Sequence, residues 1–192
     1  METIMILQLF LLICSFSTAL LQSDSEDEIL PHSRQTKKKR DTGNLSDHQQ
    51  RCTQDKQVAF SASLMASGSG YIGPFNTKTP LVFRNVVVNI GNAYNPNTGF
   101  FIAPVRGAYH FEFYLHCHGH ATYYTAAVLV KNGTPVFSAW EHQPSYSVNP
   151  SNGATLLLEI GDVVLLHLIE NSRIYDNQNH HTTFSGHLLF PM

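Results

Sequence analysis

The stretch GAYHFEFYLHCHGH, residues 107–120, combines a strand-like alternation of aromatic side chains with a row of histidines. His116, His118 and His120 recur at every second residue, and side chains at that spacing point to one side of a regular strand. Imidazole nitrogens in such a row can bind a transition metal such as zinc, and they change charge near neutral pH. No Asp, Glu or Cys shares the pattern, and Gly119 ends or bends the strand. We therefore interpret the row as the solvated face of a sheet, with a zinc site or a pH response as the alternative.

A second pair of histidines, His180 and His181, lies in the predicted loop before the last strand. These residues can join the row only if the fold brings the two segments together. The carboxylates Asp162, Glu170 and Asp176 are scattered along the chain, and the sequence has no nucleophile elbow and no zincin helix motif. We therefore predict a protein that is not an enzyme and has no cofactor, with calcium or zinc left open.

The composition describes a chain with a hydrophobic core and little charge. Of 192 residues, 43% are hydrophobic and 14% are charged, which is enough for one domain of ordinary size. The net charge is -2, and the basic residues concentrate near the N-terminus and do not form a basic face beside aromatic residues. This distribution argues against a nucleic-acid partner.

Residues 1–19 have the features of a secretory signal peptide. An apolar run from Ile4 to Cys14 is followed by small residues, and Ser17 and Ala19 are placed like the residues that a signal peptidase requires. Glu2 precedes the run and no basic residue does, so an uncleaved signal anchor is the alternative. Because the run is short for a membrane span, we predict cleavage near Ala19, secretion, and a mature chain without a membrane span.

Residues 20–55 are predicted to form a polar linker or pro-segment, because they contain no periodic apolar residues that could bury a face. The basic run from Lys37 to Arg40 could be cut by a proprotein convertase, could hold heparin-like polyanions, or could remain a solvated charge run. Asn44 begins the sequon Asn44-Leu45-Ser46 and is a candidate for N-glycosylation.

The three cysteines have different predicted fates. Cys14 lies inside the signal, so the mature chain would enter an oxidising compartment with two cysteines, Cys52 and Cys117. These two residues can form one disulfide within the chain or can have two separate fates. Cys117 continues the inward phase of Tyr109, Phe111, Phe113 and Leu115, which predicts a buried, unreactive thiol. Cys52 lies in a polar leader, and a bridge into the core would need the two Cα atoms within about 7 Å. We therefore predict that Cys52 pairs with another chain.

From Val58 onward the sequence predicts an all-β domain, because short β-branched and aromatic runs alternate with Gly, Pro and Asn without a helical period. The predicted strands are VAFSASL, LVFRNVVVN, GFFIAPV, AYHFEFYLHC, YYTAAVLVK, TPVFSAW, ATLLLEI, DVVLLHLIE and TTFSGHLLF. Tight turns are predicted at residues 131–134 and 160–162. Strands of this number and spacing indicate a sandwich, jelly roll or barrel.

Two residues of this domain have competing interpretations. Asn132 begins the sequon Asn132-Gly133-Thr134 and also the hairpin dipeptide Asn-Gly, and we favour the turn role with glycosylation as the alternative. Trp140 could anchor a binding partner, because exposed tryptophan concentrates interface energy. A single tryptophan in a β protein is more often partly buried.

A spaced pattern that begins at Phe83 resembles the signature of the complement C1q globular domain. The residues of the pattern are Phe83, Asn89, Tyr94, Phe101, Gly107, Tyr109, Phe111 and Phe113. The opening VAFSASL and the closing TTFSGHLLFPM, which contains Phe184 and Gly186, resemble that family's first and last strands. The resemblance covers residues 56–192, and the layout is most similar to short members without a collagen stalk, such as the cerebellins.

The resemblance implies a ten-stranded jelly-roll sandwich of the C1q/TNF type, assembled as a trimer, with surplus aromatic residues packed around the threefold axis. It also implies a secreted, non-catalytic ligand of an extracellular receptor or other protein. The alternative is a pattern-recognition or complement-like module that binds microbial carbohydrate or charged surfaces. Some family members bind calcium near the position of Asp176, but a single carboxylate beside Asn177 and Asn179 suits a hard cation poorly. The cerebellin resemblance further implies that Cys52 links two trimers into a hexamer.

Overall fold

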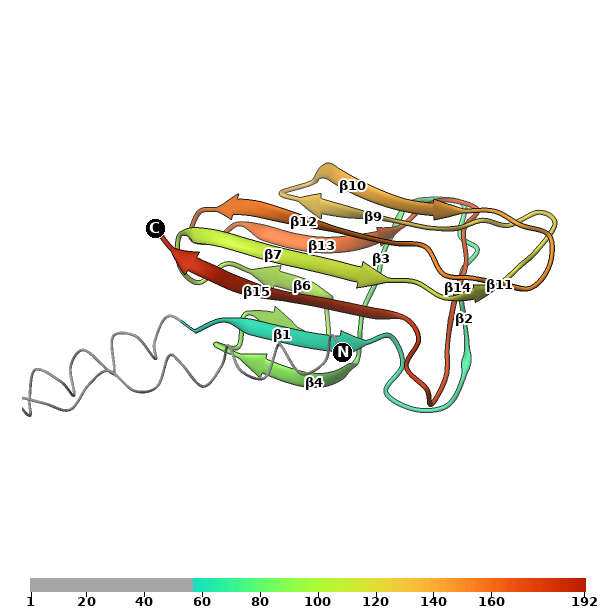
Figure 1. The fold of residues 1–192 in the computed structure, drawn as a ribbon, viewed down its shortest axis with the longest axis horizontal. Coiled ribbons are helices and arrows are strands. Elements are labelled where there is room, and N and C mark those ends of the chain that lie inside the picture. Colours follow the sequence, from blue (N-terminus) through green and yellow to red (C-terminus); the bar gives the residue numbers. More distant parts are fainter. Residues whose placement is uncertain (1–56) are drawn as a thin grey trace, which may run out of the picture. The chain divides into compact units, whose positions relative to one another are not determined.

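The computed structural model describes residues 57–192, and every regular element in that range is a β-strand. The predicted signal, the basic run 37–40, Asn44 and Cys52 lie outside the described residues. Within them, no helix is long and apolar enough to cross a membrane. The predicted all-β class is confirmed (Figure 1).

Two antiparallel sheets form the body of the domain. The five-stranded sheet has the order β12 (Ser151–Leu158), β7 (Gly107–Tyr114), β15 (Thr183–Pro191), β1 (Ala59–Ser63) and β4 (Asn85–Ile90). The six-stranded sheet has the order β10 (Thr134–Glu141), β9 (Thr125–Lys131), β13 (Val163–Leu168), β6 (Phe100–Ile102) and β5 (Tyr94–Asn95), and β3 (Thr79–Pro80) pairs with β13. Two small sheets pair β11 (Ser147–Val148) with β8 (Cys117–His118), and β14 (Ile174–Asp176) with β2 (Gly70–Ile72).

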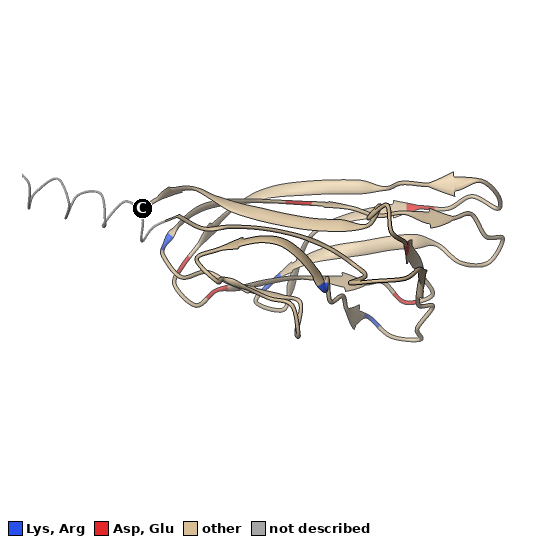
Figure 2. Ribbon diagram, turned by 90° about the horizontal axis from the view of Figure 1, so that it is seen from below, with Lys and Arg blue, Asp and Glu red and all other residues tan. Residues whose placement is uncertain are grey.

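The core lies between the two main sheets, which are seen one above the other in Figure 2. Strand β7 shows the alternation that the sequence predicts, since Tyr109, Phe111 and Phe113 are completely buried while His110 and Glu112 are half-buried. Strand β9 is buried on both faces, because Val128 and Val130 pack with Leu165 on the outer side of the six-stranded sheet. The jelly-roll sandwich expected from the resemblance is therefore present.

Several predicted strands are shorter than the sequence pattern indicates, and two of them show the reason. The run predicted at residues 81–89 is a strand only from Asn85 onward, because the backbone N–H and carbonyl of Phe83 are bound by the Tyr94 hydroxyl and not by a neighbouring strand. The run predicted at 108–117 breaks after Tyr114. There, the N–H of Leu115 donates to the carbonyl of Pro150, at 3.0 Å.

The predicted tight turns are confirmed. Asn132 and Gly133 have φ angles of 49° and 80° and connect β9 to β10, as a two-residue hairpin with positive φ requires. The side chain of Asn132 also acts in this turn, since Nδ2 donates to Oδ1 of Asp162 (2.8 Å) and Oδ1 accepts the N–H of Val163 (2.8 Å). Asn132 therefore has the structural role that we favoured from the sequence.

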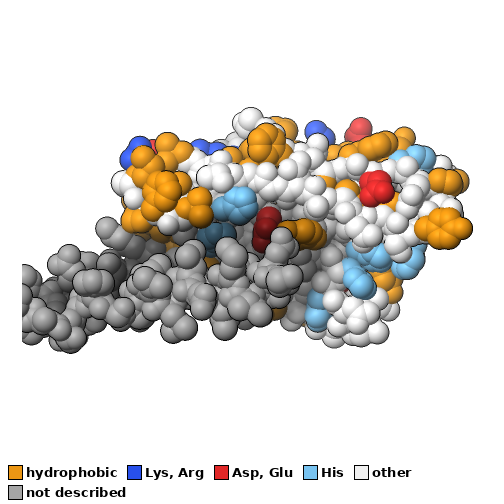
Figure 3. Space-filling view, viewed as in Figure 1, with side chains coloured by type: hydrophobic (Ala, Val, Ile, Leu, Met, Phe, Trp, Pro, Cys, Tyr) orange, Lys and Arg blue, Asp and Glu red, His pale blue; other side chains and the backbone are white. Residues whose placement is uncertain are grey.

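The long strands run between two ends of the domain that differ in chemistry. We call the end where β1 begins and β15 ends the base end, and it lies on the left in Figure 1. The opposite end, on the right, contains β2, β8, β11 and β14 with the connections 119–124, 142–146 and 169–173, and we call it the loop end. In Figure 3, histidine side chains gather at the loop end.

Candidate functional site

The residues of the sequence pattern meet in the core. The carboxamide of Asn89 holds the backbone of Tyr94, donating to its carbonyl at 2.8 Å and accepting its N–H at 3.3 Å. The Tyr94 hydroxyl in turn donates to the carbonyl of Phe83 at 3.0 Å. Burial raises the pKa of Tyr94 to about 12, so this hydroxyl keeps its proton at physiological pH. These three pattern residues therefore stabilise the fold and do not form a binding site.

The remaining aromatic residues of the pattern pack in one core cluster with Phe60 and Phe184. The Phe60 ring stacks on Tyr94 with 4.6 Å between ring centroids, and Phe101 contacts Phe111 edge-on at 5.1 Å. Phe113 and Phe184 are also fully buried. Tyr109, Phe111 and Phe113 thus fill the core of a single chain, as their shared phase along the strand predicts. Tyr114 is the aromatic residue of β7 that remains exposed.

Cys117 is completely buried, as its phase predicts. Burial raises the pKa of its thiol, and the neighbouring Thr125 hydroxyl and Arg173 charge oppose that shift only in part. Because the thiolate is the reactive form, the Cys117 thiol is protected from oxidation and exchange.

The outward side of the five-stranded sheet, which we call the five-stranded face, has small side chains on several strands. Its outward residues include Ala59 and Ser61 on β1, Ala108, His110, Glu112 and Tyr114 on β7, Gly153, Thr155 and Leu157 on β12, and Ser185, His187 and Phe190 on β15. In the middle, the His110 and His187 rings lie 5.8 Å apart. Glu112 accepts hydrogen bonds from the hydroxyls of Tyr114 and Ser185, both at 3.2 Å. The carboxylate of Glu112 raises the pKa of Tyr114. The result is a sheet face with a polar centre.

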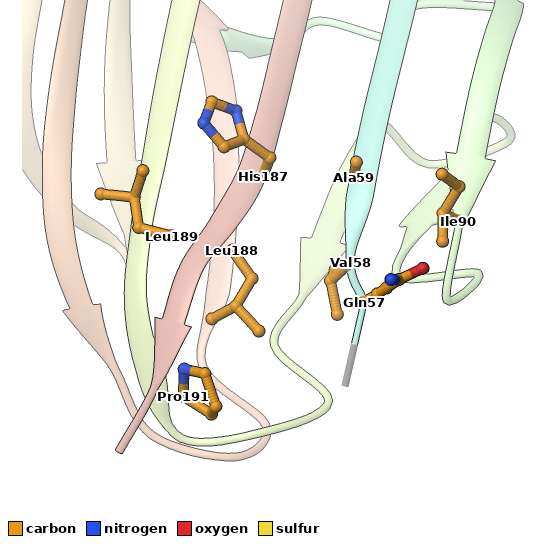
Figure 4. Close-up of a pocket in the computed structure, with 8 residues that line it drawn as sticks. All are labelled: Gln57, Val58, Ala59, Ile90, His187, Leu188, Leu189 and Pro191. Atoms are coloured by element: carbon orange, nitrogen blue, oxygen red, sulfur yellow. The ribbon is translucent and has the colours of Figure 1, made fainter. Parts of the chain in front are cut away.

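An apolar hollow continues this face at the base end (Figure 4). Its volume is about 420 Å³, and it is lined by Gln57, Val58, Ala59, Ile90, His187, Leu188, Leu189 and Pro191. Leu157, Leu189 and Phe190 are exposed nearby on β12 and β15. The base end of the five-stranded face therefore offers apolar area that a single chain leaves in water.

The histidine row does not lie on a solvated strand face, so our interpretation of it is wrong for His116. This residue is only 8% exposed, its N–H donates to the Thr182 hydroxyl, and its Nδ1 lies 2.8 Å from Oδ1 of Asn149. The break after Tyr114 turns His116 inward, while His118 stays exposed on β8. His120 stacks on Tyr123, with 4.5 Å between ring centroids.

The fold does bring the second histidine pair to the first. The His181 ring lies 4.6 Å from that of His116, whereas His180 binds the Ser63 hydroxyl through Nδ1 at 2.9 Å. Yet within residues 57–192 no three His, Cys, Asp or Glu side chains are grouped closely enough to hold a metal ion. Asp176, the third candidate ligand, is fully buried and accepts the backbone N–H groups of Met65 and Thr182. The Asp176 carboxylate therefore caps a loop, which is the role that we preferred to calcium binding on the basis of the sequence.

Aromatic rings connect these histidines across the loop end. Tyr71 lies 4.9 Å from Tyr175 between ring centroids, and its hydroxyl lies 2.9 Å from Nδ1 of His118. The Arg173 guanidinium covers the Tyr71 ring at 4.6 Å. Sequence reasoning missed Tyr71 and Arg173, because the three-residue strands β2 and β14 that position them are too short for a periodic signal.

Trp140 is exposed, not partly buried in the core. It is 58% exposed on β10, and its ring lies 5.3 Å from that of Tyr124, which contacts His142 at 4.9 Å. Tyr146, in the connection before β11, is 88% exposed. Exposed aromatic rings of this size are typical anchors in protein interfaces. The loop end therefore presents a surface that can bind a partner.

Comparisons with known proteins agree with this geometry. A family model described as the C1q domain matches residues 48–189. Human and mouse "Complement C1q tumor necrosis factor-related protein 3" are each 36% identical over 135 residues, which cover 70% of this chain and 52% of each relative. The mouse collagen alpha-1(X) chain is 31% identical over 116 residues, which cover 59% of this chain and 17% of the collagen chain. The chain thus spans about half the length, or less, of these curated relatives.

Solved structures show the same fold. The globular domain of zebrafish complement 1qA superimposes with a TM-score of 0.56 at 22% identity, covering 71% of this chain and 99% of that domain. Murine APRIL, in a crystal structure at pH 5.0, superimposes with a TM-score of 0.54 at 14% identity, covering 70% of this chain and all of that chain.

Proposed function

Since the chain belongs to the C1q domain family, we propose that it is a secreted, non-catalytic ligand that assembles as a trimer and binds an extracellular receptor or other protein through its loop end. The observation that carries the proposal is the pair of exposed aromatic residues Trp140 and Tyr146, with the half-buried Tyr124 beside Trp140, at the end opposite the base end. One end can thus bind a partner while the other connects to the leader.

The five-stranded face supports self-association. Small side chains such as Ala59, Ser61 and Gly153 permit close approach of another copy, and the apolar hollow at the base end adds area that association would bury. Most soluble oligomers of identical chains close around a symmetry axis. We assign this face to the trimer axis.

Substitution of Ala108, on β7 near the base end of that face, tests the assembly. Ala108→Arg places a long charged side chain between β12 and β15, and it is expected to convert the trimer to a monomer. The matched control Ser138→Arg, on exposed β10 of the other sheet, is expected to remain a trimer. Sedimentation of both variants in the presence of a chelator gives the masses. A monomeric parent, or an Ala108→Arg variant that stays trimeric, would contradict the assignment.

Binding of the labelled trimer to cells tests the partner. Treatment of the cells with protease is expected to abolish binding of the parent, and Trp140→Ala with Tyr146→Ala is expected to weaken binding at least about tenfold, since both rings are exposed anchors. If protease treatment leaves binding unchanged while removal of surface glycans abolishes it, the protein-ligand function is wrong.

A further inference from the structure

His110 and His187 form a pair of neighbouring imidazoles in the middle of the five-stranded face. The two residues are directly opposite each other on the antiparallel strands β7 and β15. Their rings lie 5.8 Å apart between centroids, with 54° between the ring planes. Two imidazoles that bind one zinc ion, each through a Zn–N bond of about 2.0–2.1 Å, have ring centres about 5–6 Å apart. The pair therefore has the spacing of two ligands of one transition-metal ion.

The hydrogen bonds of the pair leave ring nitrogens available for an ion. Nδ1 of His110 lies 3.0 Å from Oγ1 of Thr155, which is directly opposite on β12. With the proton on Nδ1 and donated to this hydroxyl, Nε2 carries the lone pair that a metal ion needs. Within residues 57–192, no hydrogen bond occupies Nε2 of His110 or either ring nitrogen of His187. Thr155 thus orients His110 in the way that an outer hydrogen-bond partner orients a metal-ligating histidine.

The charges around the pair favour a cation. The five strands of this sheet contain no Lys or Arg, and Glu112 is their only charged residue apart from histidine. Glu112 lies two residues from His110 on the same face of β7, so its carboxylate attracts a cation at the pair. Lys131 of the other sheet reaches the carbonyl of Leu157, but its charge is paired with Asp162 at 3.0 Å.

One chain supplies only two ligands, and it leaves space for more. No group of three His, Cys, Asp or Glu side chains in the described part of the chain is close enough to hold an ion. Zinc sites in proteins use three or four side-chain ligands. The neighbour of His187 on β1 is Ala59, whose small side chain leaves room above the pair for a group of another chain. The apolar hollow, which His187 also lines, continues that space toward the base end (Figure 4).

We propose that His110 and His187 bind a zinc ion and that the neighbouring copies in the trimer complete its coordination. The inference rests on the proposed function in one respect, namely that the five-stranded face lines the trimer axis. Around such an axis each copy presents the same residues, so the three imidazole pairs are brought toward one another. Imidazole suits zinc, copper and nickel, whereas magnesium and calcium prefer oxygen ligands. An ion shared between copies binds the trimer more tightly than the monomer, and it therefore stabilises the assembly.

The first test measures zinc binding to the full-length secreted protein by equilibrium dialysis at pH 7.5, after a chelator has removed bound metal. The double variant His110→Gln with His187→Gln is expected to bind zinc at least about tenfold more weakly than the parent, and Thr155→Val about tenfold more weakly. Thr155→Ser keeps the hydroxyl and is expected to bind like the parent. The matched control, His118→Gln with His181→Gln, removes two histidines from the loop end and is expected to bind like the parent. Excess magnesium is expected not to displace the zinc.

The second test asks whether the ion is shared between copies, by sedimentation over a dilution series. In zinc, the parent trimer is expected to persist to protein concentrations at least about tenfold lower than in chelator. The double histidine variant is expected to dissociate at the same concentration in zinc and in chelator. His110, His187 and Thr155 lie on the surface of the sheet, so their variants are expected to fold, and melting temperatures in chelator check this.

Two results would overturn the proposal. The first is zinc affinity that is unchanged in the double histidine variant or that is lost with His118 and His181. The second is zinc that binds through the pair without any effect on the dissociation of the trimer, because no second copy would then contribute a ligand. The proposed function is tested separately: a parent that is monomeric in chelator would refute the proposed trimer, whereas a trimer that zinc does not stabilise would refute only this inference.

Discussion

Gly186 provides a direct test of how closely the core is packed. On β15 it lies opposite Phe111 of β7 on one side and Phe60 of β1 on the other, so the two rings close over a position without a side chain. A methyl group added at Gly186 would lie 2.5 Å from Cδ1 of Phe111 and 2.8 Å from Cε1 of Phe60. Ordinary contact begins at 3.4 Å, so the Phe111 ring would have to shift by about 0.9 Å, the difference between 3.4 and 2.5 Å.

The Phe111 ring has little room for that shift, since Phe101 lies 5.1 Å and Phe184 6.2 Å from it between ring centroids. Overpacking of a core destabilises a fold by up to about 3 kcal/mol. Part of this loss, about 0.5–1 kcal/mol, is offset because Ala lowers the conformational entropy of the unfolded chain. We therefore expect Gly186→Ala to lower the free energy of unfolding by about 2 kcal/mol. For a domain of this size the melting temperature falls by about 8 °C.

The assay is thermal unfolding at one protein concentration, because trimer stability depends on concentration. Gly70→Ala is the matched control: its added methyl would contact only the mobile end of Met65, at 3.3 Å, and its backbone is not left-handed. This control is expected to melt within about 2 °C of the parent. If Gly186→Ala also melts within about 2 °C, the core yields more easily than the contacts indicate and the reasoning fails.

Three further predictions concern the turn, the acid range and the cysteines. Asn132→Gln is expected to lower the melting temperature, because Gln at positive φ cannot reproduce the hydrogen bonds to Asp162 and Val163. The control Thr134→Ala removes only the sequon and is expected to change the glycan mass at most. Thermal unfolding and mass spectrometry of both variants measure these effects. Hydrogen bonds from Asn132 and from the backbone of Glu159 lower the pKa of Asp162 to about 2. A carboxyl group whose pKa is depressed by folding stabilises the fold above the pKa of the unfolded chain, near 3.8, and loses that stabilisation as the pH falls through 2. The melting temperature should therefore drop more between pH 4 and pH 2 in the parent than in Asp162→Asn. Finally, non-reducing gels should show a disulfide-linked dimer that the Cys52→Ser variant no longer forms. The Cys117 thiol should react with an alkylating reagent only after unfolding. A disulfide between Cys52 and Cys117 of one chain would contradict both expectations.

The sequence could predict the elements whose cause is local. The alternation along β7 follows from the two-residue period of a strand, and the hairpin at Asn132 follows from the positive φ angles that Asn-Gly tolerates. Phe83, Asn89 and Tyr94 were found as a spaced pattern, although the hydrogen bonds that join them are visible only in the structure. Such residues are recoverable because they lie within one short segment.

The histidine row could not be predicted, because its geometry depends on distant residues. The N–H of His116 binds Thr182, which lies 66 positions away, and the carbonyl of His116 accepts the N–H of Tyr175. These contacts end the regular period of the strand at Tyr114 and turn His116 inward. Arg173 and Tyr71 were missed for the same reason, since they meet through the short pairing of β14 with β2.

Each chain buries its own core aromatic residues, and this limits which residues can hold the proposed trimer together. Because Tyr109, Phe111 and Phe113 are already buried within one chain, a partner chain adds nothing to their burial. In the proposed trimer, assembly then depends on residues of the five-stranded face, where Ala108 and Leu157 lie beside the polar pair His110 and His187. A protomer should therefore keep its fold when the face is altered, and the loop end should keep its ring and histidine contacts, because those contacts lie within one chain. Ala108→Arg can thus separate the contribution of multivalency from that of the loop end: a folded monomer should still bind cells through Trp140 and Tyr146 but more weakly than the trimer, since three linked sites bind a cell surface more tightly than one.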